Sequence, residues 1–110
     1  MGIFNIEDMA QQMVTAASRA LSGKSQAAIG LARTEFPKIA RSVEFIESEY
    51  ASGRMSQEDA RSHLALQENS VRTALLAIKG IELIAVESAV NAALDVVRDV
   101  VNSALGFALI

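Results

Sequence analysis

Apolar residues in the first half of the chain recur at alternating steps of three and four, which is the spacing of a helix that packs along another helix. The pattern comprises Ile29, Ala32, Phe36, Ile39, Val43, Ile46 and Tyr50. Pro37 lies inside it and removes one backbone hydrogen bond. Since the pattern keeps its phase across Pro37, we expect a kink or short break there, with a new helix starting at Pro37 as the alternative. An earlier helix is predicted to begin after Asn5, whose side chain suits a helix N-cap.

A tight turn is predicted at residues 52–55, close to the midpoint of the chain. Gly53 suits the left-handed backbone conformation that often follows a helix end. Ser56 is followed three residues later by Asp59, an acidic variant of the reciprocal capping pattern at helix N-termini. We therefore expect a helix to begin at Gln57 and to run antiparallel to the helix before the turn.

The second half of the chain has helical periodicity from Gln57 to Leu105, with no proline and no second capping pattern. Gly80 costs about 1 kcal/mol relative to alanine, but a glycine does not by itself end a helix. An unbroken helix of this length would span about 70 Å. We therefore predict an all-α fold: a single domain, residues 1–110, built as a long antiparallel helical hairpin with a kinked first arm. The alternative is a compact four-helix bundle that folds at Gly23 and Gly80.

Two sets of apolar positions are assigned to two kinds of contact. The seam inside the hairpin is predicted to comprise Ile39, Val43, Ile46, Tyr50, Leu64, Val71 and Ile78. The C-terminal arm has one polar stripe, and the apolar remainder covers about twice the circumference that one neighbouring helix buries. Because a large exposed apolar surface usually marks an interface, we expect the hairpin to pack into an oligomeric helical bundle. The predicted oligomer interface comprises Ile84, Ala85, Ala89, Ala92, Ala93, Val96, Val97, Val100, Val101, Leu105, Phe107 and Leu109.

The rest of the C-terminal arm leaves alternatives open. The polar stripe comprises Glu87, Asn91, Asp95, Arg98 and Asn102. It is either a solvated face or a set of groups buried between chains to fix their register. The apolar tail, residues 104–110, either fills a groove on a neighbouring subunit or enters a membrane interface, although it lacks the basic flanks typical of interfacial helices.

Composition and charge narrow the range of partners. Hydrophobic residues make up 51% of the chain but aromatic residues only 5%, so the core is expected to consist mainly of small aliphatic side chains. The net charge of −3 gives no general electrostatic attraction to nucleic acid. The absence of cysteine excludes disulfides and thiolate metal sites. With no recognisable secretory signal and no run of roughly 20 apolar residues, a cytoplasmic protein is expected.

Few residues suggest chemistry. His63 is the single histidine, whereas a metal site would require further histidines or converging carboxylates. Residues 22–25 match the end of a phosphate-binding loop, but Ser18 stands where that loop has its first glycine, and the preceding segment is helical. Catalytic carboxylates need a cleft, and a slim hairpin offers none. We therefore expect no catalytic residues, no metal, no cofactor and no enzymatic activity.

These patterns support two hypotheses about function. The first is a structural or assembly protein, a self-associating helical hairpin that forms a homo-oligomer or a filament. The second is a helical binding module whose apolar C-terminal arm is covered by a partner, either another helical protein or a membrane surface.

Overall fold

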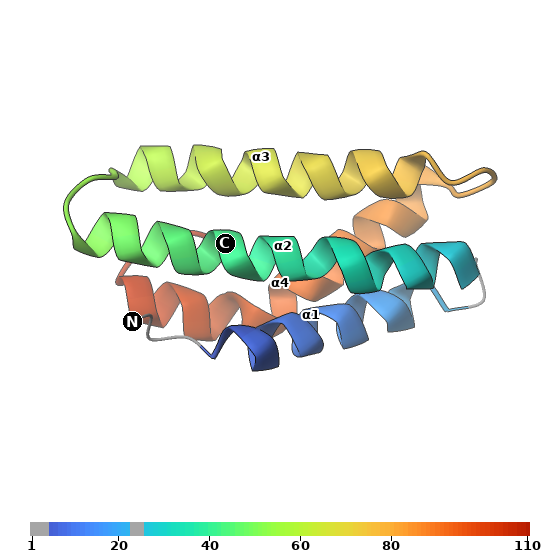
Figure 1. Ribbon diagram of the computed structural model, residues 1–110, viewed down its shortest axis with the longest axis horizontal. Coiled ribbons are helices and arrows are strands. Elements are labelled where there is room, and N and C mark those ends of the chain that lie inside the picture. The colour runs from blue at the N-terminus through green and yellow to red at the C-terminus, as the bar shows by residue number, and fades with distance from the viewer. Residues whose placement is uncertain (1–4, 23–25) are drawn as a thin grey trace.

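Four helices account for most of the chain in the computed structural model, which describes residues 5–22 and 26–110. They are α1 (Ile6–Ala20), α2 (Gln26–Ala51), α3 (Gln57–Leu76) and α4 (Leu83–Leu105). No strand occurs in these two described ranges, so the predicted all-α class is confirmed (Figure 1).

The predicted starts of α1 and α3 are confirmed by their capping hydrogen bonds. The Asn5 side-chain oxygen accepts from the Asp8 amide at 3.0 Å. At α3, the Ser56 hydroxyl accepts from the Asp59 amide at 3.0 Å. The Asp59 carboxylate accepts in return from the Ser56 amide at 3.5 Å, which completes the capping box. Such caps satisfy amides that have no partner within the helix.

The predicted break at Pro37 is absent, because α2 is one helix from Gln26 to Ala51 with Pro37 inside it. The alternative of a new helix starting at Pro37 is wrong for the same reason. The apolar spacing that continues across Pro37 explains this outcome. Phe36, Ile39 and Val43 are all fully buried, so packing on both sides of the proline holds the helix together despite the missing hydrogen bond. A kink at this position stays a prediction.

The predicted long hairpin is wrong, because the second arm is not one helix. The chain reverses at residues 77–82, between α3 and α4, and Gly80 has a φ of +87° there. A glycine can adopt this left-handed conformation without the strain that a side chain would cause. The described residues form the compact four-helix arrangement that was the alternative, with extents of 43 × 23 × 18 Å. The other proposed folding point, Gly23, lies outside the described residues.

The four helices surround a single hydrophobic core. In Figure 1, α1 and α3 lie on opposite sides of α2, and α4 contacts α1 most extensively. The turn at residues 52–56 makes α2 and α3 an antiparallel pair, as predicted. The largest fully buried side chains come from all four helices and include Met13, Phe36, Ile39, Ile46, Leu64, Leu75, Val86 and Val90.

The C-terminal tail folds back on its own chain. The Asn102 side-chain oxygen accepts from the amides of Leu109 at 2.9 Å and Ile110 at 3.1 Å. The ring of Phe107 stacks on Tyr50 of α2, with 4.8 Å between centroids, and lies under the guanidinium of Arg61 of α3. The tail is therefore accommodated within its own subunit, and neither a neighbouring groove nor a membrane interface is needed to cover it.

Candidate functional site

Most of the predicted oligomer interface lies inside the single subunit. Seven of its twelve residues are buried, namely Ala85, Ala89, Ala93, Val97, Val101, Leu105 and Leu109. The second neighbour that this helix requires is α1 of the same chain, which packs along α4. These seven residues are therefore covered within the subunit, whereas the predicted interface between subunits would place them at its surface.

The remaining five predicted interface residues lie wholly or partly at the surface. Ile84 is 71% exposed, Val100 56% and Val96 45%. Ala92 and Phe107 are half-buried. The seam predicted inside the hairpin does lie in the interior: Ile39, Val43, Ile46, Leu64 and Val71 are buried, and Tyr50 and Ile78 are half-buried.

A cluster of aliphatic side chains surrounds the turn between α3 and α4. We call it the apolar tip and define it as Leu76, Ile78, Ile81, Leu83 and Ile84. Three of its members are exposed large hydrophobic residues: Leu76 is 44% exposed, Leu83 60% and Ile84 71%. The other two, Ile78 and Ile81, are half-buried and pack against the core. The exposed members therefore lie at the helix ends on either side of the turn, where polar residues are more usual.

Local backbone geometry places the apolar tip at the end of the bundle. The amide of Ile81 donates to the Ile78 carbonyl at 3.3 Å across the turn, and Gly80 supplies the left-handed residue. Glu82 is the N-cap residue of α4, but its side chain makes no capping hydrogen bond. No side-chain hydrogen bond therefore stabilises this turn within the described residues, and Ile78 and Ile81 anchor it by packing against the core.

Two opposite charges lie within the apolar tip. Lys79 and Glu82 are both exposed, and neither side chain forms an ion pair or hydrogen bond with any residue that the structure describes. They lie on either side of Ile81 in the same short turn.

An ionic network connects α3 and α4 close to the apolar tip. The Arg72 guanidinium on α3 donates to the Glu87 carboxylate on α4 at 2.8 Å and to Glu68 on its own helix at 3.5 Å. Burial raises the pKa of the Glu68 carboxyl, although the charge of Arg72 opposes this shift. The network links α3 to α4 behind the turn that joins them.

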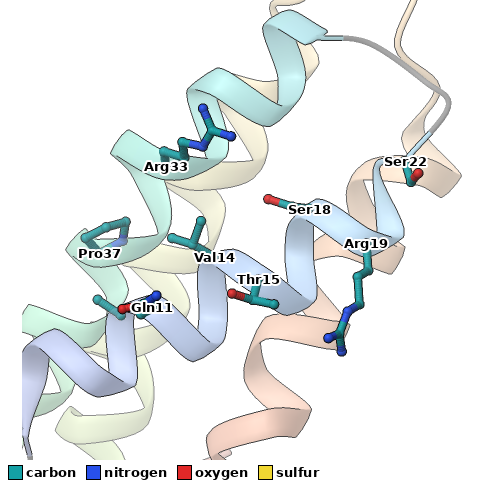
Figure 2. A pocket seen from close by; sticks show the side chains of 9 residues that line it. Gln11, Val14, Thr15, Ser18, Arg19, Ser22, Arg33 and Pro37 are labelled. Atoms are coloured by element: carbon teal, nitrogen blue, oxygen red, sulfur yellow. The ribbon is translucent and has the colours of Figure 1, made fainter.

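A groove of about 760 Å³ runs between α1 and α2 (Figure 2). Its lining includes Val14 and Pro37 together with hydroxyl, amide and guanidinium groups, among them Ser18, Arg19 and Arg33. Figure 2 shows the guanidinium groups of Arg19 and Arg33 pointing away from each other. The two cations therefore do not converge on one ligand atom, and the groove lacks the geometry of a compact anion site.

Within residues 5–22 and 26–110, no group of three or more potential metal-ligating side chains occurs. His63 instead stacks on Phe45, with 5.2 Å between ring centroids. None of the described helices is both long enough and apolar enough to cross a membrane.

Comparison with protein-family models, curated proteins and solved structures finds no match to this chain.

Sequence reasoning found one member of the tip, Ile84, as an interface residue but missed Leu76, Ile81 and Leu83. The available signal was a glycine inside an apolar run, Gly80 between Ile78 and Ile81. Since no cap or proline accompanies it, the run resembles a continuous helix.

Proposed function

We propose that this protein is a structural or assembly protein that self-associates through its apolar tip. The observation that carries the proposal is the exposure of Leu76, Leu83 and Ile84 around one turn at the end of the bundle. Exposed apolar patches on soluble domains commonly mark interaction sites, and a second copy of the chain offers a surface of the same character.

The charges beside the tip favour a two-fold symmetric contact. In such a contact each surface meets its own copy, so Lys79 of one subunit can lie opposite Glu82 of the other. Both side chains lack partners among the described residues of the monomer, and the pairing would occur twice. A symmetric tip-to-tip dimer therefore covers the aliphatic residues and matches the charges at the same time.

The size of the tip sets the expected strength of the dimer. Stable interfaces bury about 800 Å² per partner, and five side chains around one turn supply only part of this area. We therefore expect a concentration-dependent dimer with a dissociation constant in the micromolar range or weaker. A filament requires a second contact surface on each subunit, and the exposed Val96 and Val100 on the flank of α4 are the residues we propose for it.

Sedimentation equilibrium from about 1 µM to about 1 mM tests the proposal. The wild-type mass is expected to rise with concentration from 11.7 kDa toward twice that value. Ile84→Lys should keep the protein monomeric, because it places a charge in the tip. The matched control is Leu66→Lys, since Leu66 is 67% exposed on α3 but lies outside the tip.

A charge exchange tests the symmetry of the contact. Lys79→Glu places two carboxylates opposite each other and should weaken the dimer by about fivefold. The double variant Lys79→Glu/Glu82→Lys should restore the wild-type affinity. A mass of one subunit at every concentration, or equal loss of the dimer in the Leu66 control, contradicts the proposal. A monomeric protein that floats with lipid vesicles would instead identify a membrane surface as the occupant of the tip.

A further inference from the structure

A second groove, between α2 and α3, combines positive charge with an aromatic wall. It has a volume of about 480 Å³, and its lining residues are Lys38, Arg41, Ser42 and Phe45 of α2 with His63 and Gln67 of α3. This volume is within the range of small-molecule sites in proteins. The lining includes two permanent cations and no carboxylate, in a chain whose net charge is −3.

The aromatic wall is formed by one ring from each helix. Phe45 is 49% exposed, and its ring centroid lies 5.2 Å from that of His63 with the planes tilted by 38°. Both helices therefore hold Phe45 in place while half of its surface remains open to solvent. A planar ring from a ligand can cover that surface in a stacked or tilted arrangement, which aromatic pairs prefer.

The polar groups of the groove are largely unengaged. No ion pair or hydrogen bond connects the Arg41 or Gln67 side chain to any other described residue. Ser42 is buried as a residue, and its hydroxyl has no hydrogen-bond partner in the described ranges. Every fully buried side-chain polar atom in those ranges does have a hydrogen-bond partner. The Ser42 hydroxyl must therefore reach solvent, which it does at the groove that it lines.

Lys38 differs from Arg41 in having an internal partner. Its ammonium group lies 3.1 Å from the carboxylate of Glu35, whose side chain is 9% exposed and which does not line the groove. The Lys38 charge is thus partly compensated by a carboxylate outside the groove. Arg41 has no ion-pair or hydrogen-bond partner among the described residues, and its planar guanidinium can donate two parallel hydrogen bonds to a carboxylate or phosphate.

We propose that this groove binds small planar organic anions, with the ring of the ligand against Phe45 and its carboxylate or phosphate on Arg41. The Ser42 hydroxyl and the Gln67 amide supply further donors, and Lys38 adds positive charge. This site is separate from the apolar tip and does not depend on self-association.

Amide chemical shifts in solution test the site with defined probes. The probe is 2-naphthoate, with 2-naphthamide as the ring without the charge and acetate as the charge without the ring. We expect saturable shifts at Ser42, Phe45, His63 and Gln67 with naphthoate, with a dissociation constant of about 1 mM. Both control compounds should bind at least about fivefold more weakly. Phenyl phosphate in place of naphthoate shows whether the groove prefers a phosphate or a carboxylate.

Variants on one helix separate the site from general charge effects. Arg41→Gln should weaken naphthoate binding by about fivefold. Arg33→Gln is the matched control, because Arg33 is also exposed on α2 and also lacks a partner among the described residues, but lines the other groove. Phe45→Ser should weaken binding by a similar factor while leaving the melting temperature almost unchanged, because the ring is half exposed. Equal effects of the two arginine variants, equal binding of the neutral amide, or shifts confined to other surfaces would overturn the proposal.

Discussion

The turns that follow α2 and α3 both reverse the chain, but different groups stabilise them. In the turn at residues 52–56, polar side chains stabilise the backbone: Ser52 donates to the Ser48 carbonyl at 2.8 Å, and the Arg54 guanidinium binds the Glu49 carboxylate at 2.9 Å. In the turn at residues 77–82, no side chain forms a hydrogen bond with the described part of the chain. Side chains of the first turn thus bond to neighbouring groups of the chain. In the second, Lys79 and Glu82 have no side-chain partner among the described residues, and Leu76, Leu83 and Ile84 beside it are exposed.

The difference lies in whether side chains of the turn form hydrogen bonds with the turn itself. A turn stabilised by its own capping side chains presents a polar surface to solvent, and this surface does not require a partner protein to cover it. A turn stabilised by the backbone and by the Arg72 network behind it leaves its outer side chains available.

The largest expected effect is the removal of the helix cap at the first turn. Ser56→Ala should lower the free energy of unfolding by about 1 kcal/mol, because the Asp59 amide loses its acceptor. The same replacement at the N-cap of α4, Glu82→Ala, should change it by no more than about 0.3 kcal/mol, since the Glu82 side chain makes no capping hydrogen bond. Urea unfolding at a concentration where the protein is monomeric measures both. Equal losses at the two positions would show that the turns do not differ.

The next effect should be the same at both turns. Gly53 and Gly80 have φ values of +76° and +87°, and an added Cβ would meet no other atom within 4 Å at either position. Alanine should therefore cost about 1 kcal/mol at each, from backbone strain alone. Gly30, in the interior of α2, also has open space around it but no left-handed backbone. Gly30→Ala should stabilise the protein by about 0.5–1 kcal/mol, so the sign of the effect distinguishes strain from crowding.

These two glycines also show why one turn could be predicted from the sequence and the other could not. At the first turn, Gly53 is followed within six residues by Ser56 and Asp59, whose capping hydrogen bonds are local. At the second, Gly80 interrupts an apolar run that keeps helical spacing on both sides. Whether such a glycine continues a helix or reverses the chain depends on tertiary packing, which local sequence does not contain.

The same limit applies to the candidate site. The spacing of apolar residues in α4 correctly indicated more buried surface than one neighbour requires. It could not indicate that the second neighbour is α1 of the same chain, because periodicity describes which faces are buried and not what buries them. Ile84 was identified because it belongs to the same apolar pattern, whereas Leu83 lies outside that pattern and became part of the tip through the turn.

A smaller effect is expected when the second turn is given the cap that it lacks. Glu82→Asp shortens the side chain so that its carboxylate can accept from an amide in the first turn of α4, as Asn5 does in α1. This should raise the free energy of unfolding by about 0.5–1 kcal/mol. Because the negative charge is retained, the dimer proposed for the tip should keep its affinity. Glu82→Ser supplies a similar cap without the charge, so it should raise stability equally but weaken self-association.

The smallest expected effect is electrostatic, and it has opposite signs near the two turns. Hydrogen bonds from Arg54 lower the pKa of the Glu49 carboxyl beside the first turn, whereas burial raises the pKa of Glu68 in the network behind the second. The folded state therefore binds the Glu49 proton less readily than the unfolded chain does, and the Glu68 proton more readily. Carboxyl chemical shifts followed against pH should show Glu49 titrating below an ordinary glutamate and Glu68 above it.

The consequence for stability follows from these two directions. The contribution of Glu49 is present above the pKa of the unfolded chain and is lost as the pH falls through its lowered value in the folded state. The contribution of Glu68 is largest in acid and declines as the pH rises from the unfolded pKa through its raised value in the folded state. Glu49→Gln should therefore reduce the loss of unfolding free energy in acid. Glu68→Gln should remove the decline in unfolding free energy that accompanies ionisation of Glu68 as the pH rises. If the Glu68 variant instead loses more stability as the pH rises through that window, the ion pair of Glu68 with Arg72 outweighs the cost of burying its carboxylate. Glu68 and Glu49 would then contribute to stability with the same sign.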